Sequence, residues 1–373
     1  MKYVLSLFLL LLILSCNDIR QQNEKNILGN WIKVKNPATA NRNIVLEVPY
    51  FDNAGFNFYK NGTFENKTSY LRRTDSTTIN LGGGSKYRID ADSLYLLNPN
   101  GNKWEAHLLT KLTPDTLQFD LWNNKLATFK HYKPGNHKNP TFEKIVLSTS
   151  GCYGSCPIMS IILNDDGTIL FKGLEYTGKK GLFEGKITKE KFQQLQANFS
   201  KADIASLKDR YNVSRSDDET ISTTFIQNGK IYKTIDDYGR SAPFEFTWAY
   251  IPVRYLYQQL SLTKMPIPPF ISSRFKKIRG SSFRKGKKIA ELTESEAFLL
   301  SDYLRNGKVT DITFAQRFNL VIEYSDLPRD TIKTNGRFFT FKIKDKFQTV
   351  DIGFNFYDVN QQQWKWRKIY DYD

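Results

Sequence analysis

Apolar and polar residues alternate along much of this chain, and turn residues separate the alternating runs. A period of two is typical of antiparallel strands that bury one face. In a first segment, about residues 26–138, such runs flank Asn61 and Gly62, which form a strong hairpin signal. We expect strands in this segment at residues 29–31, 56–59, 63–64, 87–89, 93–97, 104–109 and 116–121. No long helical pattern interrupts them, which indicates an antiparallel β domain.

A second segment, about residues 142–264, mixes strands with helices. A helix is predicted after Thr188, a favourable N-cap, because Phe192, Leu195 and Phe199 then share one face. The aromatic-rich residues 243–260 are also predicted to be helical. Strands are expected at residues 144–148, 158–163, 168–172, 222–226 and 231–235, with hairpin turns at Asp166 and Gly167 and at Asn228 and Gly229. This order of elements indicates an α+β domain.

A third segment, about residues 270–373, follows a stiff proline-rich linker. Thr293 and Glu296 form a capping box, which predicts a helix that ends near Gly307. Strands are expected at residues 318–324, 338–343 and 349–356, with Asn335 and Gly336 as a hairpin turn. Aromatic residues make up 14% of the chain, so core-building side chains are plentiful. We therefore predict a mostly β protein with an N-terminal antiparallel domain, an α+β domain and a small α+β C-terminal module.

The first fifteen residues have the order of a secretory signal peptide: Lys2, an apolar run over residues 3–14, and the small residue Ser15. The run is shorter than the roughly 20 residues that a membrane span needs. Residues 13–16 resemble the lipobox of bacterial lipoproteins, which implies cleavage before Cys16, lipid such as palmitate on its sulfur, and a flexible tether over residues 16–25. An ordinary signal peptide that meets a cysteine by chance and a buried apolar helix are the alternatives.

The first segment resembles the lipocalin-like domains of bacterial envelope lipoproteins. The resemblance rests on a Gly-x-Trp at Gly29 and Trp31, on the up-and-down strands, and on the sequence Leu-Thr-Pro-Asp-Thr-Leu at residues 112–117. It implies a small closed barrel, whose interior either encloses a small apolar ligand or is filled by side chains. We interpret Trp31 as a core residue that closes the barrel.

The second segment resembles an uncharacterised domain family of envelope proteins that opens with Cys-aromatic-Gly-x-Cys-Pro. Residues 152–157 match this motif, and Asp166 and Gly167 match the hairpin that follows it. The family carries no established activity, so the resemblance implies a domain boundary and no chemistry.

Cys152 and Cys156 are the two cysteines that remain once Cys16 takes lipid. In an oxidising compartment they most simply form a disulfide that clamps a tight turn. Two alternatives stay open: an exchangeable redox pair, and a Cu(I) site in which Cys152, Cys156 and Met159 offer two thiolates and a thioether.

The chain is strongly basic, with a net charge of +16, and the predicted signal segment removes one lysine from this total. Such a surface attracts the anionic lipid and polysaccharide of an envelope, whereas an exported chain seldom meets nucleic acid, which we do not expect as a partner. The densest basic run holds eight cations in fifteen residues and no acid: Arg274, Lys276, Lys277, Arg279, Arg284, Lys285, Lys287 and Lys288. We interpret it as a docking surface for anionic groups, with a solvated loop or edge strand as the alternative.

Catalytic patterns are weak. His107, His131 and His137 lack the spacing of a zinc site or triad. The glycines at residues 82–84 lead into a strand, where a phosphate loop would lead into a helix. The acidic clusters at residues 217–219 and 236–237 are expected to be solvated turns.

The leading hypothesis is a non-enzymatic envelope lipoprotein that binds or scaffolds, needs no cofactor, and is anchored to a membrane outside the cytoplasm, most simply the outer membrane. The second hypothesis is a thiol redox or Cu(I)-handling protein that acts through Cys152 and Cys156. A hydrolase whose residues converge only in space is the third.

Overall fold

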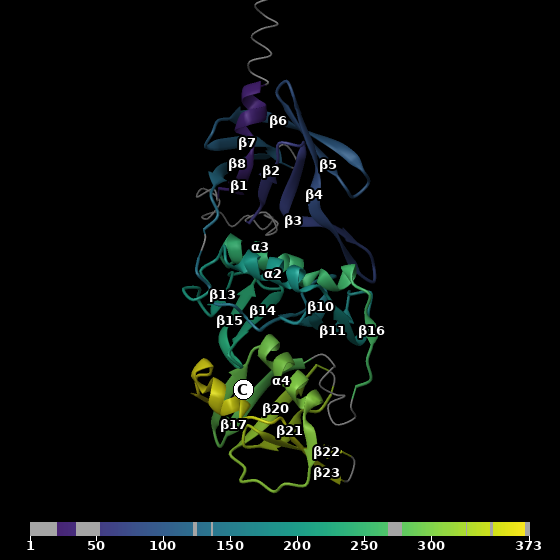
Figure 1. Cartoon of the computed structure of the whole chain (residues 1–373), viewed down its shortest axis with the longest axis vertical. Coiled ribbons are helices and arrows are strands. Elements are labelled where there is room, and N and C mark those ends of the chain that lie inside the picture. Colours follow the sequence, from purple (N-terminus) through teal and green to yellow (C-terminus); the bar gives the residue numbers. More distant parts are fainter. Residues whose placement is uncertain are drawn as a thin grey trace, which may run out of the picture. The chain divides into compact units, whose positions relative to one another are not determined.

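The computed structural model describes residues 21–34, 53–121, 125–135, 137–267, 278–325, 327–343 and 346–369. The chain divides into two compact units, which Figure 1 draws in sequence colours. The barrel unit falls within residues 1–72 and 79–135, and the two-sheet unit within residues 73–78 and 136–373. The predicted signal peptide, residues 1–15, and the lipid-attachment residue Cys16 lie outside the described residues.

The described part of the predicted tether is helical over residues 21–26. The amide of Gln22 donates to Asn26 Oδ1 at 2.8 Å, one helical turn away, and the next residue, Ile27, is fully buried in the barrel core. The second half of the expected tether, residues 21–25, is therefore helical and leads directly into the barrel core.

Eight antiparallel strands form a closed barrel, as the sequence predicts. Closure comes from β1, which pairs with β2 on one side and with β8 on the other. The strands are β1 (Gly29–Lys33), β2 (Gly55–Phe58), β3 (Thr63–Arg73), β4 (Thr78–Asp90), β5 (Ser93–Asn98), β6 (Lys103–Leu112), β7 (Thr116–Leu121) and β8 (Lys125–Tyr132). The strand pattern of β8 was not recognised in the sequence, and the glycines at residues 82–84 lie inside β4.

Aromatic rings occupy the barrel interior. Trp31 is 0% exposed and its indole N–H donates to Ile27 O at 2.7 Å, which confirms its prediction as a core residue. The ring of Phe56 lies within 6.0 Å, centroid to centroid, of four neighbours: Phe58, Phe64, Phe119 and Phe129. Side chains therefore fill this part of the interior.

The two-sheet unit begins with the middle sheet, whose strand order is β13-β15-β14-β9-β10-β11-β12-β16. Its strands are β9 (Lys144–Thr149), β10 (Ile158–Asn164), β11 (Thr168–Glu175), β12 (Gly181–Lys186), β13 (Arg210–Tyr211), β14 (Thr220–Gln227), β15 (Lys230–Tyr238) and β16 (Thr263–Lys264). Helices α2 (Lys189–Phe199) and α3 (Phe244–Arg254) cover one face (Figure 1), and the short 3-10 helix η3 (Leu256–Gln259) follows α3. Thr188 caps α2, and Phe192, Leu195 and Phe199 are its buried residues, as predicted.

The C-terminal sheet has the order β19-β23-β22-β21-β20-β17-β18-β24. Its strands are β17 (Ile278–Lys285), β18 (Lys288–Leu292), β19 (Lys308–Thr310), β20 (Phe318–Tyr324), β21 (Asp330–Thr334), β22 (Phe338–Ile343), β23 (Lys346–Asp351) and β24 (Arg367–Lys368). The helices are α4 (Glu294–Asn306), α5 (Phe356–Asn360) and the 3-10 helix η5 (Gln361–Gln363). The strand expected at residues 349–356 ends at Asp351, because Asn355 caps α5 by accepting from Asp358 N–H.

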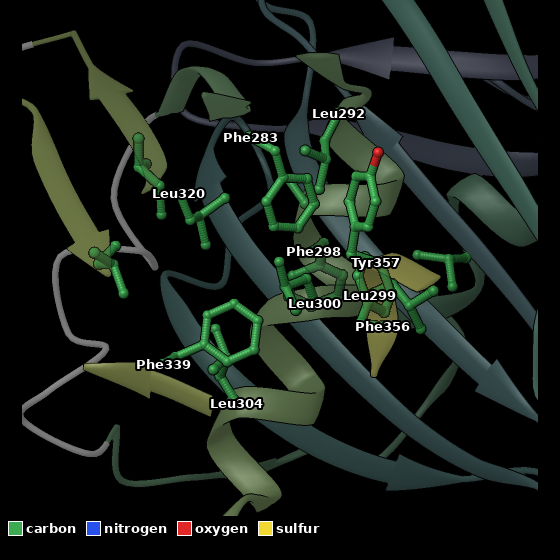
Figure 2. Packing of buried hydrophobic residues seen from close by; sticks show 14 of the residues in the cluster. Phe283, Leu292, Phe298, Leu299, Leu300, Leu304, Leu320, Phe339, Phe356 and Tyr357 are labelled. Carbon is green, nitrogen blue, oxygen red and sulfur yellow. The ribbon is translucent and has the colours of Figure 1, made fainter. Parts of the chain in front are cut away.

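Helix α4 lies between the two sheets and joins their cores. It starts with the predicted capping box of Thr293 and Glu296. It contacts β9, β10 and β14 of the middle sheet and β17 and β18 of the C-terminal sheet. Figure 2 shows its leucines among aromatic side chains of the C-terminal segment; the labelled core residues are Phe283, Leu292, Phe298, Leu299, Leu300, Leu304, Leu320, Phe339, Phe356 and Tyr357. One shared core therefore fastens the two sheets together.

Candidate functional site

The cysteine motif forms an exposed, disulfide-closed turn between β9 and β10. Cys152 and Cys156 are joined, with their Cα atoms 5.7 Å apart, as the sequence predicts. Tyr153 at the tip is 90% exposed, and its backbone N–H donates to Asp217 O at 2.9 Å. The turn is therefore tied to the chain before β14 and remains open to solvent.

Met159, the third residue of the hypothetical Cu(I) site, lies in β10 and is 1% exposed. Its backbone pairs with Thr149 of β9. Both cysteine sulfurs are used by the disulfide, so neither is a thiolate ligand in this structure. Among the described residues, no group of three or more His, Cys, Asp or Glu side chains is placed to hold a metal ion.

The basic run is partly a β-hairpin. Arg274, Lys276 and Lys277 lie outside the described residues, and only the backbone of Arg279 is described. Arg284 is neutralised by an ion pair of 2.6 Å with Glu323, whereas Lys285, Lys287 and Lys288 are exposed. Phe283, within the same run, is fully buried in the core. Among the side chains of the run that are described, the available charge is therefore concentrated at the turn between β17 and β18.

Strand β24 extends this charge across the sheet. Lys285 is the Cα partner of Lys288, and Lys288 is the Cα partner of Lys368 in β24. All three side chains are exposed. We call Lys285, Lys288 and Lys368 the lysine ladder. Like charges directly opposite each other on neighbouring strands destabilise a sheet, so an anion bound here would relieve a repulsion.

A row of polar side chains crosses the middle sheet on the face that meets α4. Successive Cα partners in this polar row are Asp236, Ser222, Ser148, Ser160 and Lys172. All five are buried. Ser148 Oγ donates to Ser160 Oγ at 2.9 Å, so the central hydroxyls satisfy each other. An acid and a base stand at the two ends of the row.

The N-terminus of α4 meets the acidic end of the polar row. Ser295 Oγ lies 2.7 Å from Ser222 Oγ and 2.6 Å from Thr224 Oγ1. Burial raises the pKa of Asp236, opposed by the hydrogen bond from Ser222 and the charge of Arg210. Burial likewise raises the pKa of Glu296, opposed first by the hydrogen bond from the Trp364 indole. Both carboxyls are thus shifted towards their neutral forms.

The basic end of the polar row opens into a cavity of about 380 Å³ between the two sheets. Lys172 is 6% exposed, and desolvation lowers its pKa to about 8 despite the nearby Glu294 carboxylate. Its Nζ lies 5.4 Å from the centroid of the Phe298 ring. A perturbed amine in a cavity is the pattern expected of a functional site.

Sequence reasoning missed Lys172 as a site residue. One signal was present, because alternation places Lys172 on the same face as Leu170, which is buried. A lysine at an inward-facing position of a strand is unusual and marks either a partner or a cavity.

The two predicted acidic turns are only partly solvated, because Asp217 is exposed but three of their five carboxyl groups are buried. Glu219 is buried and paired with Arg254 and Arg240, and Asp236 and Asp237 are buried as well. Tyr250 Oη donates to Asp237 at 3.0 Å, as do the backbone N–H groups of Ser241 and Ala242 at 2.7 and 2.9 Å. The prediction was wrong for these three residues because the fold supplies each with partners. Arg254 and Arg240 pair with Glu219, and Arg210 of β13 and Ser222 of β14 contact Asp236. Asp237 is held by Tyr250 of α3 and by the loop that directly follows β15.

The histidines are dispersed. His107 Nδ1 lies 2.7 Å from Asp120 O, and the His131 ring packs edge-on against Trp31 at 5.1 Å. His137 lies near the start of the longer segment of the two-sheet unit, where its backbone N–H donates to Ser200 O. In the described structure, each histidine therefore has its own, different partners.

Among the described residues, no helix is long and apolar enough to cross a bilayer.

A family described as a domain of unknown function, DUF6438, matches residues 143–257. This range holds the whole polar row and the disulfide turn, together with α2 and α3. No curated protein matches the chain.

Proposed function

We propose that the protein is a non-enzymatic binding or scaffolding lipoprotein of the cell envelope, anchored through Cys16, which docks on anionic lipid through the lysine ladder. The observation that carries the docking is the direct opposition of Lys285, Lys288 and Lys368 on three neighbouring strands. This arrangement costs stability in the free protein, and an anionic surface returns about 1 kcal/mol for each basic residue close to it.

The anchor and the ladder support each other in this proposal. The Ile-Leu-Ser-Cys sequence at residues 13–16 resembles a lipobox, and a lipid on Cys16 would keep the ladder at high effective concentration near headgroups. Anionic lipid is preferred to polysaccharide as the partner because an anchored protein faces lipid at all times. The barrel is taken as filled, since the Phe56 ring and its four neighbours occupy the interior.

The anchor is tested by labelling cells with radioactive palmitate. The wild-type protein is expected to carry label in the membrane fraction, and Cys16→Ser is expected to lose it. Label on the Cys16→Ser protein, or a full-length unlabelled wild type in the cytosol, would contradict the anchor.

The docking is tested with the unlipidated Cys16→Ser chain and vesicles that contain phosphatidylglycerol, at low salt. The triple change of Lys285, Lys288 and Lys368 to Glu is expected to weaken binding at least about tenfold, from the loss of roughly 1 kcal/mol per residue. A charge-matched control changes Lys189, Lys208 and Lys230, all exposed, to Glu and should keep most of the affinity. Equal losses of vesicle affinity in the two triple variants would show that only net charge matters and would contradict docking through the lysine ladder. Binding to soluble acidic polysaccharide but not to vesicles would contradict lipid as the partner and indicate polysaccharide instead.

The barrel assumption has its own test. Organic extraction of the purified protein is expected to release no stoichiometric apolar molecule. A molecule recovered at one per chain would contradict the filled barrel and indicate that the barrel carries a ligand.

Thiol redox or Cu(I) handling is the second candidate, favoured by the exposure of the disulfide turn. Under the leading proposal, the double change of Cys152 and Cys156 to Ser leaves vesicle binding intact and lowers the free energy of unfolding by at most about 2 kcal/mol, the value for closing so short a loop. The second candidate would be favoured if the reduced protein bound stoichiometric Cu(I) and the Met159→Leu variant did not.

A further inference from the structure

The cavity at the basic end of the polar row is lined by two buried residues, Lys172 and Ser281, whose polar atoms make no hydrogen bond to the described residues. Within the described residues, Lys172 Nζ forms neither a hydrogen bond nor an ion pair, and its contact is the face of the Phe298 ring at 5.4 Å. Ser281, on β17 of the opposite sheet, is also 6% exposed, and its Oγ has no hydrogen-bond partner. Both residues line the same cavity of about 380 Å³.

Leaving these two groups without hydrogen-bond partners lowers the stability of the folded protein. A buried polar group without a partner destabilises a protein by about 1–3 kcal/mol, and an unpaired ammonium by more. Both lie in a cavity large enough for a ligand, and both are hydrogen-bond donors. A bound acceptor would satisfy them together.

The remaining walls limit what that acceptor can be. Apolar side chains, including Leu174, Leu292 and Phe298, line the cavity beside the two donors. Helix α4 begins at Glu294 in the wall, so its positive end also favours an anion. The Glu294 carboxylate lies in the same wall and disfavours a second negative charge. A ligand with one anionic group and an apolar body fits all of these features.

We propose that this cavity binds a small amphipathic monocarboxylate, whose carboxylate accepts hydrogen bonds from Lys172 Nζ and Ser281 Oγ while its apolar part lies against Leu174, Leu292 and Phe298. The proposal does not depend on membrane docking, because the lysine ladder does not line the cavity.

The binding test uses octanoate as the probe and octanamide as a neutral ligand of the same length, with calorimetry on the full chain. Octanoate is expected to bind at least tenfold more tightly than octanamide. Octanoate affinity is also expected to fall as the pH rises through about 8, the pKa of Lys172, because the neutral amine loses its charge. Glu294 is the other titratable group among the described lining residues. Failure of octanoate to bind at millimolar concentration, or equal affinity for both probes, would overturn the proposal.

Single substitutions in the cavity test which side chains contact octanoate. Lys172→Met removes the amine and leaves an unbranched apolar side chain one atom shorter, and it is expected to weaken octanoate binding at least tenfold and to abolish its pH dependence. Ser281→Ala should weaken binding several-fold. The matched control is Ser301→Ala, because Ser301 lines the same cavity but its Oγ already donates to Ala297 O at 2.8 Å, and this variant should bind normally. Retained binding in both Lys172→Met and Ser281→Ala would contradict the site.

Thermal unfolding distinguishes a binding role from a structural one. Without ligand, Lys172→Met should melt no lower than the wild type, because it removes an unpaired buried amine. With saturating octanoate, the wild type should gain stability and Lys172→Met should not. A large loss of stability in ligand-free Lys172→Met would identify the lysine as structural. If that variant does not fold, the comparison of Ser281→Ala with Ser301→Ala still decides the proposal.

Discussion

At the scale of single residues, the role of a buried charged side chain depends on whether it has a partner of opposite charge. The side chain of Arg254 is 1% exposed, and two of its nitrogens donate to the two carboxylate oxygens of Glu219. Arg240 contacts the same carboxylate at 3.3 Å. Lys172 is buried to a similar degree with no such partner. We therefore interpret the first group as part of the architecture and the second as a binding site.

Removing the charge of Glu219 should be strongly destabilising. Glu219→Gln leaves Arg254 buried beside a neutral amide, and we expect a loss of about 3–5 kcal/mol in the free energy of unfolding. Urea denaturation measures this loss. Asp358→Asn, which breaks the exposed pair of Asp358 with Arg317, is the control and should cost less than about 1 kcal/mol. Similar small losses in both variants would show that Arg254 is hydrated in solution.

Glu296 predicts a pH dependence of stability. Burial raises its pKa in the folded state, so the folded protein binds a proton more readily than the unfolded chain. Stability from this group is therefore present below the unfolded pKa and is lost as the pH rises through the folded pKa. Glu296→Gln mimics the protonated form, so its stability relative to the wild type should increase from pH 4 to pH 8. A constant difference across that range would contradict the raised pKa.

At the scale of elements, local chemistry at the ends of helices and strands was a reliable guide. Thr188 and Thr293 begin helices as predicted, and the turn at residues 228–229 joins the two expected strands. The turn at residues 335–336 is also present, but it joins the expected β22 to β21, which was not predicted. Strand ends that depend on distant contacts were less predictable. Asn355 ends the run after β23 because its amide both caps α5 and donates to Asn335 O at 3.1 Å.

Two Asn-Gly turns allow a matched comparison. Gly336 and Gly229 both have positive φ, +99° and +69°, so alanine at either position is strained by about 1–2 kcal/mol. A Cβ on Gly336 would also come within 2.2 Å of Asn355 Oδ1, which is held by its hydrogen bond to α5, whereas a Cβ on Gly229 meets open space. Gly336→Ala should therefore lower the free energy of unfolding clearly more than Gly229→Ala in chemical denaturation. Equal effects would mean that Asn355 can move at little cost.

At the scale of the whole molecule, the two units have separate cores. The barrel core comprises residues between Ile27 and Phe129, and the core around α4 comprises residues between Val146 and Trp364. Each cluster is complete within its own unit. The units are thus expected to unfold as distinct cooperative bodies.

Core truncations test this independence. Phe129→Ala should lower only the melting transition of the barrel, and Phe283→Ala only that of the two-sheet unit, each with a loss of about 3–5 kcal/mol. Calorimetry measures the transitions, and hydrogen exchange with mass spectrometry assigns them to residues. A single transition that both variants shift equally would show that the units fold as one body.

Many strands, the helix starts after Thr188 and Thr293, and the Asn-Gly turns of this protein follow from local sequence, because alternation, N-caps and turn residues act over a few neighbouring residues. Strands such as β8, β12 and β21 were not recognised in the sequence. The disulfide was also predictable, since Cys152 and Cys156 lie four residues apart. Tertiary structure alone decided the polar row, the burial of Glu219, the partnership of Lys368 with Lys288, and the cavity between Lys172 and Ser281. Each of these depends on the register of strands or helices that are far apart in the chain, and that register is set by packing of the whole core.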